Sequence, residues 1–377
     1  DVRLAFLSPL PPAPTGIADY SADVLALLAG RHEIDAFHAE PAVEGLPSKV
    51  TPRPVAELLP RHRERPYDVA VYQMGNGPEH SFLYDLMQRV PGLLVLHDLV
   101  LHHARARQFL DSPEARAYAG DPSNAARRDA ARPAIQAYRD EAAYCYPAQA
   151  GRLAEAHLGT VGDLLPYAYP LFRIPVEASR LVAVHNEYMA EAIRDEVPSA
   201  AVMRIPMAAE RVPVAEAAVT ALRVRLGLDP DDFVVGCFGL LTREKQIETV
   251  ARAVARAASA LPQVRLLLVG PTPHRERLEA LLARLGLREW TTIAGRVPLV
   301  ELPAHIEAAD MVAHLRYPTA RETSAALLRV LAQGRPTVIS DLEHLDIPPE
   351  AVVRLDVTAE EGGLTRAIVG LAGDAQG

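Results

Sequence analysis

The chain has 377 residues, 49% of them hydrophobic and 23% charged, which is enough for two ordinary globular domains. Its net charge of −9 and the absence of a basic run argue against a nucleic-acid partner, because a polyanion requires a basic face. With only Cys145 and Cys237, the sequence excludes a disulfide framework or a zinc–cysteine cluster and predicts a reducing compartment.

No apolar run reaches the roughly 18 residues that a membrane-spanning helix needs, and no signal peptide is visible. We therefore expect a cytoplasmic protein. Peripheral contact with the inner face of a membrane stays open, although no cationic amphipathic helix predicts it. No pattern in the sequence predicts the oligomeric state.

The N-terminal half begins with an apolar strand, Val2–Ser8, followed by a proline-rich loop. Gly16 then provides a tight turn into a helix over 17–29, so the loop from Thr15 to Tyr20 lies where a strand ends and a helix begins. Four further strands are predicted in this half, over 68–73, 93–97, 181–185 and 201–205. Residues 104–178 show helical periodicity without a strand pattern, and we interpret them as a helical insertion.

A connector near residues 207–231 leads into a second series of alternating strands and helices. Its strands are predicted over 233–239, 264–270, 291–294, 310–314, 337–340 and 352–355, and a terminal helix over 360–371. Such alternation predicts an α/β fold with parallel sheets and helices on both faces. We expect two Rossmann-like doubly wound domains, 1–208 and 209–377, that face each other across a ligand cleft; the last helix could also pack back on the N-terminal domain.

The stretch from His314 to Asp341 contains a strand end, a polar loop, a capped helix and a further strand. Thr323 or Ser324 is expected to cap the helix. The loop that starts at Arg316 thus lies at the carboxyl edge of a parallel sheet, where a helix N-terminus favours an anionic phosphate.

Two residues stand out for their chemistry. Of the two lysines in the chain, Lys49 fits a solvated surface position, whereas Lys245 follows a predicted strand on the ligand edge. There a lysine can serve as a point charge on phosphate, with Arg243 beside it. His97 also ends a strand, where an imidazole can bind a sugar hydroxyl or relay a proton; a core histidine satisfied by its neighbours is the alternative.

Several common sites are not predicted. His97, His102 and His103 lack the cysteine or carboxylate partners that would complete a metal site, so we expect no metal. Gly16 is not followed by a GxGxxG or GxxxxGK(S/T) pattern, which argues against a dinucleotide or ATP P-loop site. No GxSxG elbow is present, so a Ser-His-Asp triad is not expected.

Motifs over nearly the whole chain resemble the retaining GT-B glycosyltransferases of family 4, also called group 1. The resemblance is strongest in the second half, in FGLLTREKQIE, LLLVGPTPH, IAGRVPLVEL and EAADMVAHLRYPTARETSAALLRVLAQGRPTVISD. In the first half it rests on SPLPPAPTGIADYS, LVLHD and VAVHNEYM. It implies a GT-B fold, a nucleotide-sugar in the second domain, an acceptor in the first, and no metal or other cofactor.

The resemblance also implies roles for individual residues. Lys245 would contact the donor diphosphate, and the Gly16 N–H would contact its phosphate. His97 would contact the donor sugar, the Arg296–Val297 backbone would contact the base, and Glu322 would orient donor hydroxyls. The other donor-site candidates are Arg243, Arg316, Thr323, Ser324 and Arg329, and the acceptor-site candidates are Tyr20, Asp98 and His185.

The donor site departs from the family pattern at three positions. Arg321 and Arg329 stand where most members carry a pair of glutamates, and Glu322 lies one position after the first. Leu240 stands where a second basic residue is expected. These replacements leave the donor sugar and its base unassigned.

The main expectation is a retaining transferase that moves a hexose from a nucleoside diphosphate sugar to a hydroxyl of a glycan or glycolipid, in bacterial glycan or glycoconjugate synthesis. The alternative is a GT-B-like protein that binds nucleotide or glycan without transferring sugar. An epimerase or a phosphorylase has less support, because the lysine context that a phosphorylase cofactor needs is not found.

Overall fold

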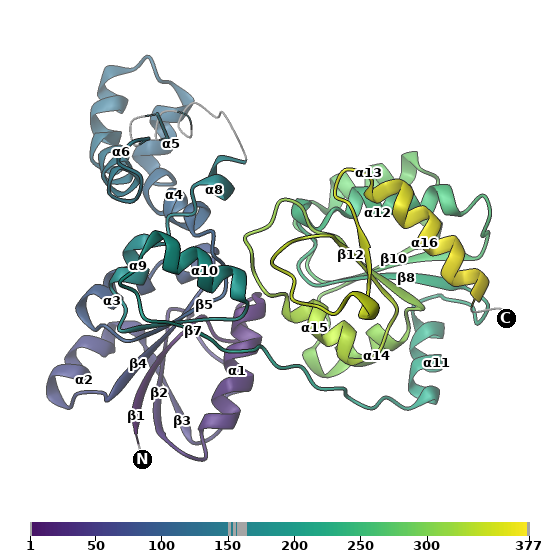
Figure 1. Cartoon of the computed structure of the whole chain (residues 1–377), viewed down its shortest axis with the longest axis horizontal. Coiled ribbons are helices and arrows are strands. Elements are labelled where there is room, and N and C mark those ends of the chain that lie inside the picture. The colour runs from purple at the N-terminus through teal and green to yellow at the C-terminus, as the bar shows by residue number, and fades with distance from the viewer. Residues whose placement is uncertain (1, 150–151, 154–155, 157–163, 375–377) are drawn as a thin grey trace. The chain divides into compact units, whose positions relative to one another are not determined.

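The computed structural model describes residues 2–149, 152–153, 156 and 164–374. By its internal contacts the chain divides into two units, the first comprising Asp1–Pro206 with Ala320–Thr323 and the second comprising Met207–Thr319 with Ser324–Gly377. Each unit is built around one parallel sheet covered by helices (Figure 1). The α/β architecture with two Rossmann-like units, predicted from the alternating pattern, is confirmed.

The first unit holds a seven-stranded sheet. Its strands are β1 (Arg3–Leu7), β2 (Glu33–His38), β3 (Val50–Pro54), β4 (Val69–Met74), β5 (Leu93–Leu96), β6 (Leu181–Val184) and β7 (Val202–Arg204). They lie in the order β3-β2-β1-β4-β5-β6-β7, and all neighbours pair in parallel. The order reverses between β1 and β4, and in doubly wound sheets ligands bind beyond the carboxyl ends of the strands at such a point.

Helices cover both faces of this sheet (Figure 1). Leu4 and Phe6 of β1 pack in one core with Leu25 of α1, whereas Ala5 and Leu7 belong to the core that α2, α3 and α10 cover. The alternation follows from the two-residue period of a strand. The described helices are α1 (Gly16–Leu28), α2 (Leu58–Glu64), α3 (Leu83–Arg89), α4 (His102–Leu110), α5 (Pro113–Gly120), α6 (Ala125–Cys145), α8 (Leu165–Ala168), α9 (Arg173–Glu177) and α10 (Glu187–Glu196).

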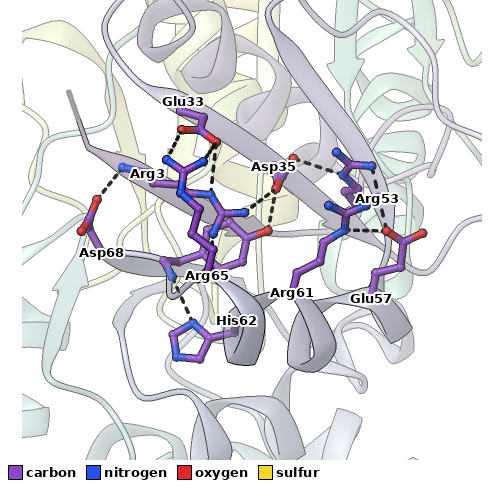
Figure 2. Close-up of polar contacts among 10 residues, drawn as sticks. Arg3, Glu33, Asp35, Arg53, Glu57, Arg61, His62, Arg65 and Asp68 are labelled. Carbon is purple, nitrogen blue, oxygen red and sulfur yellow. Dashed lines mark hydrogen bonds and ion pairs between the residues drawn. The ribbon is translucent and has the colours of Figure 1, made fainter.

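Strands β2 and β3 were missed by the sequence analysis, because charged residues and prolines interrupt their apolar pattern. Asp35 is buried on β2, where its carboxylate accepts hydrogen bonds from Arg3 at 3.4 Å, Arg53 at 3.1 Å and the Tyr67 hydroxyl at 2.5 Å (Figure 2). A buried charge is tolerated when it is paired in this way. Pro52 is accommodated because β3 is an edge strand.

The insertion predicted over 104–178 contains helices and loops but no strand among its described positions, and it begins slightly earlier, with α4. Residues 150–151, 154–155 and 157–163 lie outside the described part. Arg105 of α4 donates to Glu141 of α6 at 2.7 Å in a buried ion pair, and its guanidinium lies 4.0 Å from the centre of the Tyr84 ring of α3. These contacts attach the insertion to the helices that cover the sheet.

The second unit holds a six-stranded sheet. Its strands are β8 (Phe233–Phe238), β9 (Val264–Val269), β10 (Thr291–Gly295), β11 (Met311–His314), β12 (Thr337–Ser340) and β13 (Val353–Leu355). They pair in parallel in the order β10-β9-β8-β11-β12-β13, so the order reverses between β8 and β11.

The helices of this unit are α11 (Glu216–Arg225), α12 (Ile247–Ala257), α13 (Arg275–Arg284), α14 (Leu302–Glu307), α15 (Ala325–Ala332) and α16 (Glu360–Asp374). The last helix, α16, belongs to the second unit. Leu364, Ile368 and Ala372 form the apolar stripe of α16 and join the core of the second unit with residues of α12.

Candidate functional site

Lys245 lies at the point of strand-order reversal in the second unit. It ends a short 3₁₀ turn, Arg243–Lys245, that follows β8. Its Nζ lies 3.3 Å from Nε2 of His314, the last residue of β11, and both side chains are buried. Because β8 and β11 are the two strands on either side of the reversal, the ammonium group lies where a doubly wound sheet binds its ligand.

His314 is the partner of Lys245 that the sequence analysis did not assign. An ammonium group only donates, so His314 Nε2 must be the unprotonated ring nitrogen. Burial holds the pKa of His314 well below its usual value, and the charges of Lys245 and Arg316 lower it further. The positive charge of this pair therefore resides on the lysine, where an anion can use it.

Two glycines bring the strand ends of this edge together. Gly270 has a φ of +141°, and a Cβ on it would lie 1.8 Å from the Gly239 carbonyl oxygen. Gly239 has a φ of +104°, and its own Cβ would lie 3.9 Å from the Lys245 Nζ. The backbone therefore passes beside the ammonium group without a side chain in between.

The other donor candidates of the second unit are placed as follows. Ser324 caps α15, where its Oγ accepts from the Leu327 N–H at 3.4 Å, and the Arg316 N–H donates to Ser340 Oγ at 2.8 Å. Arg243 and Arg296 are exposed, while Val297 and Arg329 are half-buried. Of the two predicted caps, Ser324 is confirmed.

Glu322 and Thr323 belong to the first unit, in the segment Ala320–Thr323. Asn186 Nδ2 donates to the Arg321 carbonyl at 3.0 Å and to Thr323 Oγ1 at 3.2 Å. The guanidinium of Arg321 lies 4.9 Å from the centre of the Tyr188 ring, and its φ is +61°. Arg321, which replaces the first glutamate of the family pattern, thus has an aromatic ring as one of its contacts.

Gly16 is the first residue of α1, just beyond the carboxyl end of β1. Thr15 caps the helix, with its Oγ1 accepting from the backbone N–H groups of Ile17 at 3.0 Å and Ala18 at 3.2 Å. Gly16 itself is exposed, and a Cβ on it would meet no atom within 4 Å. The fold does not require glycine at this position, so its small size leaves room for a ligand at the helix N-terminus.

Tyr20, His97 and His185 come together in the first unit. The ring of Tyr20 lies edge-on to both imidazoles, with ring centres 4.9 Å from His97 and 5.5 Å from His185. His97 Nδ1 lies 3.2 Å from His185 Nε2, and His97 Nε2 lies 2.7 Å from Gln73 Oε1. Burial lowers the pKa of both histidines and raises that of Tyr20, so the cluster is neutral near pH 7.

Asp98 takes part in a polar group between β4, β5 and α4. Its Oδ2 accepts from the Asn76 N–H at 2.7 Å, and the side chain of Asn76 contacts His103 Nδ1 at 2.9 Å. A Cβ on Gly75 would lie 3.0 Å from Asp98 Oδ2 and 2.3 Å from Ile17 Cδ1. Gln73 and Asn76 were not among the predicted site residues, although Gln73 ends a predicted strand and Asn76 follows it, where functional polar residues gather.

Metal ligands and reactive thiols are not found in the part of the chain that the structure describes. No group of three or more His, Cys, Asp or Glu side chains there could hold a metal ion. Cys145 and Cys237 are buried, and burial raises the pKa of each to about 12. Both therefore stay protonated at neutral pH. No described helix has the length and hydropathy that crossing a membrane requires.

Residues 232–374 match the family model described as glycosyl transferases group 1. They form a group 1 glycosyltransferase domain. The match covers the second sheet with Lys245, His314 and Ser324. The 2-deoxystreptamine glucosyltransferase of Streptomyces kanamyceticus is 32% identical over 124 residues, which are 33% of this chain and 30% of that protein.

A second relative of the chain is the GDP-mannose-dependent alpha-(1-6)-phosphatidylinositol monomannoside mannosyltransferase of Mycolicibacterium smegmatis. It is 32% identical over 165 residues, 43% of each chain. The chain thus spans less than half the length of the curated relatives it matches.

Solved structures extend the likeness to the fold of both units. HepE from Anabaena in complex with UDP-glucose has a TM-score of 0.66 at 16% identity, covering 100% of this chain and 91% of that one. WaaG, a glycosyltransferase involved in lipopolysaccharide biosynthesis, has a TM-score of 0.64 at 13% identity, covering 99% and 94%. These likenesses show the GT-B fold that the sequence predicted.

Proposed function

We propose that the protein is a retaining glycosyltransferase that moves a sugar from a nucleoside diphosphate sugar to an acceptor hydroxyl. The observation that carries this proposal is the buried Lys245 ammonium beside a neutral His314 at the strand-order reversal of the glycosyltransferase domain. A diphosphate leaving group needs positive charge at such a position. The names of the relatives support the same reaction class.

The reaction would need no protein nucleophile. The bond between the anomeric carbon and the diphosphate oxygen breaks, and the acceptor hydroxyl oxygen forms its bond on the same face. The hydroxyl proton passes to the departing phosphate oxygen. Lys245, the Gly16 N–H and the N-terminus of α15 at Ser324 would stabilise the charge that develops on the diphosphate, which makes a metal ion unnecessary.

The remaining roles are part of the proposal and rest on the resemblance to the family. Tyr20, Asp98 and His185 lie at the carboxyl edge of the first sheet, and we assign the acceptor to this edge. Glu322 would orient donor hydroxyls. A glycan or glycolipid acceptor, work at the inner face of a bacterial membrane and a place in family 4 belong to the proposal as well.

Replacing Lys245 tests the function directly. We expect Lys245→Ala to lower the release of nucleoside diphosphate from UDP- and GDP-sugars about 100-fold or more, because a buried charge facing the leaving group is lost. Lys49→Ala is the matched control, since Lys49 is the other lysine and is exposed. Wild-type turnover by a folded Lys245→Ala protein would show that the phosphate role is wrong.

A second candidate function is binding of nucleotide or glycan without transfer. It is favoured by the arginines at positions 321 and 329, where most of the family has glutamates. A panel of nucleotide-sugars distinguishes the two functions. Binding measured by calorimetry without transfer or hydrolysis of any donor would favour the binding protein.

A further inference from the structure

A continuous hydrogen-bonded chain crosses the first sheet at its carboxyl edge. It runs from the Ile205 carbonyl to His185 Nδ1 over 2.9 Å, from His185 Nε2 to His97 Nδ1 over 3.2 Å, and from His97 Nε2 to the Gln73 side-chain amide over 2.7 Å. Gln73, His97 and His185 are all buried. Gln73 is the second-last residue of β4, and His97 and His185 directly follow β5 and β6. Because these strands are neighbours, the sheet fixes the spacing of the three side chains.

The Ile205 carbonyl determines where the protons lie. A carbonyl only accepts, so His185 Nδ1 must carry a hydrogen. In a neutral imidazole the other nitrogen then has no hydrogen, so His185 Nε2 accepts and His97 Nδ1 donates to it. Because a neutral imidazole carries one ring hydrogen and that of His97 is on Nδ1, His97 Nε2 has none. It can only accept a hydrogen bond from Gln73.

Gln73 can provide that donor by a half-turn of its amide group. The oxygen and nitrogen of an amide are nearly the same in size and exchange places in the half-turn. With Oε1 toward His97, as in the structure, the pair of histidines would need one additional proton. Both rings are buried, Tyr20 lies against them as a neutral phenol, and burial lowers the pKa of each imidazole. The neutral arrangement is therefore favoured.

We propose that His185 and the Ile205 carbonyl are positioning groups that hold His97 as the neutral tautomer protonated on Nδ1, with the Gln73 amino group facing His97 Nε2. His97 then presents a hydrogen-bond acceptor, never a donor, at this edge of the sheet. A sugar hydroxyl that reaches Nε2 donates to it and displaces Gln73. In this role His185 acts through His97, because its two ring nitrogens are engaged by the Ile205 carbonyl and by His97.

The ring-nitrogen pattern can be measured without any substrate. We expect long-range proton–nitrogen spectra of the full chain, labelled with ¹⁵N-histidine, to show both residues protonated on Nδ1 and bare on Nε2 near pH 7. Spectra of His97→Asn and His185→Gln variants assign the signals among the 13 histidines. A protonated Nε2 on His97 in the wild-type protein would overturn the proposal.

Replacing Gln73 by glutamate reverses the hydrogen bond between this side chain and His97 Nε2 with little change in side-chain shape. A carboxylate cannot donate, so His97 Nε2 should become protonated, and the pair should take up one proton because the Ile205 carbonyl still requires a hydrogen on His185 Nδ1. If His97 Nε2 carries a hydrogen in both the wild type and Gln73→Glu, Gln73 is already an acceptor and the proposal is wrong. The wild-type spectrum decides the matter if this variant does not fold.

Two replacements of His185 distinguish its hydrogen bond to His97 from the space that its ring fills. His185→Gln keeps an oxygen that can accept from His97 Nδ1–H, whereas His185→Phe keeps an aromatic ring without an acceptor. We expect His185→Phe to lose the His97 tautomer and to lower kcat/KM for the donor about tenfold, and His185→Gln to restore most of both. Equal losses in the two folded variants would assign His185 a purely structural role.

The kinetic part of this test rests on the proposed transferase function, whereas the nitrogen pattern does not. An absence of turnover in the wild type would therefore contradict the function and leave the proton arrangement standing. A wild-type enzyme that turns over donor but shows a protonated His97 Nε2 would contradict only the arrangement.

Discussion

At the scale of single residues, the sequence and the structure give different information about Gly16. The sequence indicates a glycine that opens a helix after a proline-rich loop. The structure shows that its φ lies outside the left-handed region and that a side chain would meet no atom of the protein within 4 Å. The fold therefore does not require the glycine, and this agrees with the phosphate contact proposed for it.

We expect Gly16→Ala to keep or slightly raise stability, since alanine restricts the unfolded chain and favours a helix. Turnover of the nucleotide-sugar should fall about tenfold or more if the proposed contact exists, because a methyl group would displace the phosphate that we propose at the helix N-terminus. Gly30→Ala, near the other end of α1, is the control, since its Cβ also meets no atom within 4 Å. Equal activity of the two variants would remove Gly16 from the site.

At the scale of elements, β2 and β3 show where sequence reasoning fails. A strand is recognised by apolar alternation, and β2 carries Glu33 and Asp35 while β3 carries two prolines. What makes β2 a strand is the pairing of Asp35 with Arg3 and Arg53, and these partners come from the neighbouring strands β1 and β3 (Figure 2). A window of local sequence contains no such information.

The network around Asp35 should hold this side of the sheet together. We expect Asp35→Asn to lower the free energy of unfolding by about 3 kcal/mol, because Arg3 and Arg53 lose a buried carboxylate. Glu57→Gln in the same network is the control and should change the free energy by less than about 1 kcal/mol, because the Glu57 side chain is 41% exposed. Urea unfolding of the two variants gives the comparison, and equal effects would contradict the buried role.

At the scale of the whole molecule, buried histidines couple stability to pH. Burial lowers the pKa of His80 to about 4 from the usual 6.5, and lowers those of His97, His185 and His314 as well. The unfolded chain therefore binds more protons than the folded one between these values, so stability rises with pH. The stability that these neutral histidines contribute is present at neutral pH and is lost as the pH falls from 6.5 toward 4.

For His80 alone the expected loss is about 2 kcal/mol between pH 7 and pH 5. Urea unfolding at the two pH values measures it. His80→Asn is the matched variant, because an amide can still donate to the Gln73 carbonyl that His80 Nδ1 contacts but does not titrate. A variant with the same pH dependence as the wild type would show that His80 is not responsible.

The sequence by itself determined the two alternating series, the helical insertion, and the strand-to-helix loops that carry Gly16, His97 and Lys245. These features depend on residues close together in the chain, where periodicity, glycine and caps act locally. The first and last helices, predicted over 17–29 and 360–371, lie within three residues of the observed bounds for the same reason. The resemblance of its motifs to group 1 glycosyltransferases pointed to the fold that the solved structures share and to the family whose model matches residues 232–374.

Only the tertiary structure decided the order of the strands, and with it which side chains meet. His97 and His185 are 88 residues apart and Lys245 and His314 are 69 apart, yet each pair lies within hydrogen-bonding distance. Strand order places them there, and buried polar groups must then find partners that no local pattern specifies. The sequence therefore identified candidate functional residues one by one. Only the fold showed which of them pair and which nitrogen of each pair carries the hydrogen.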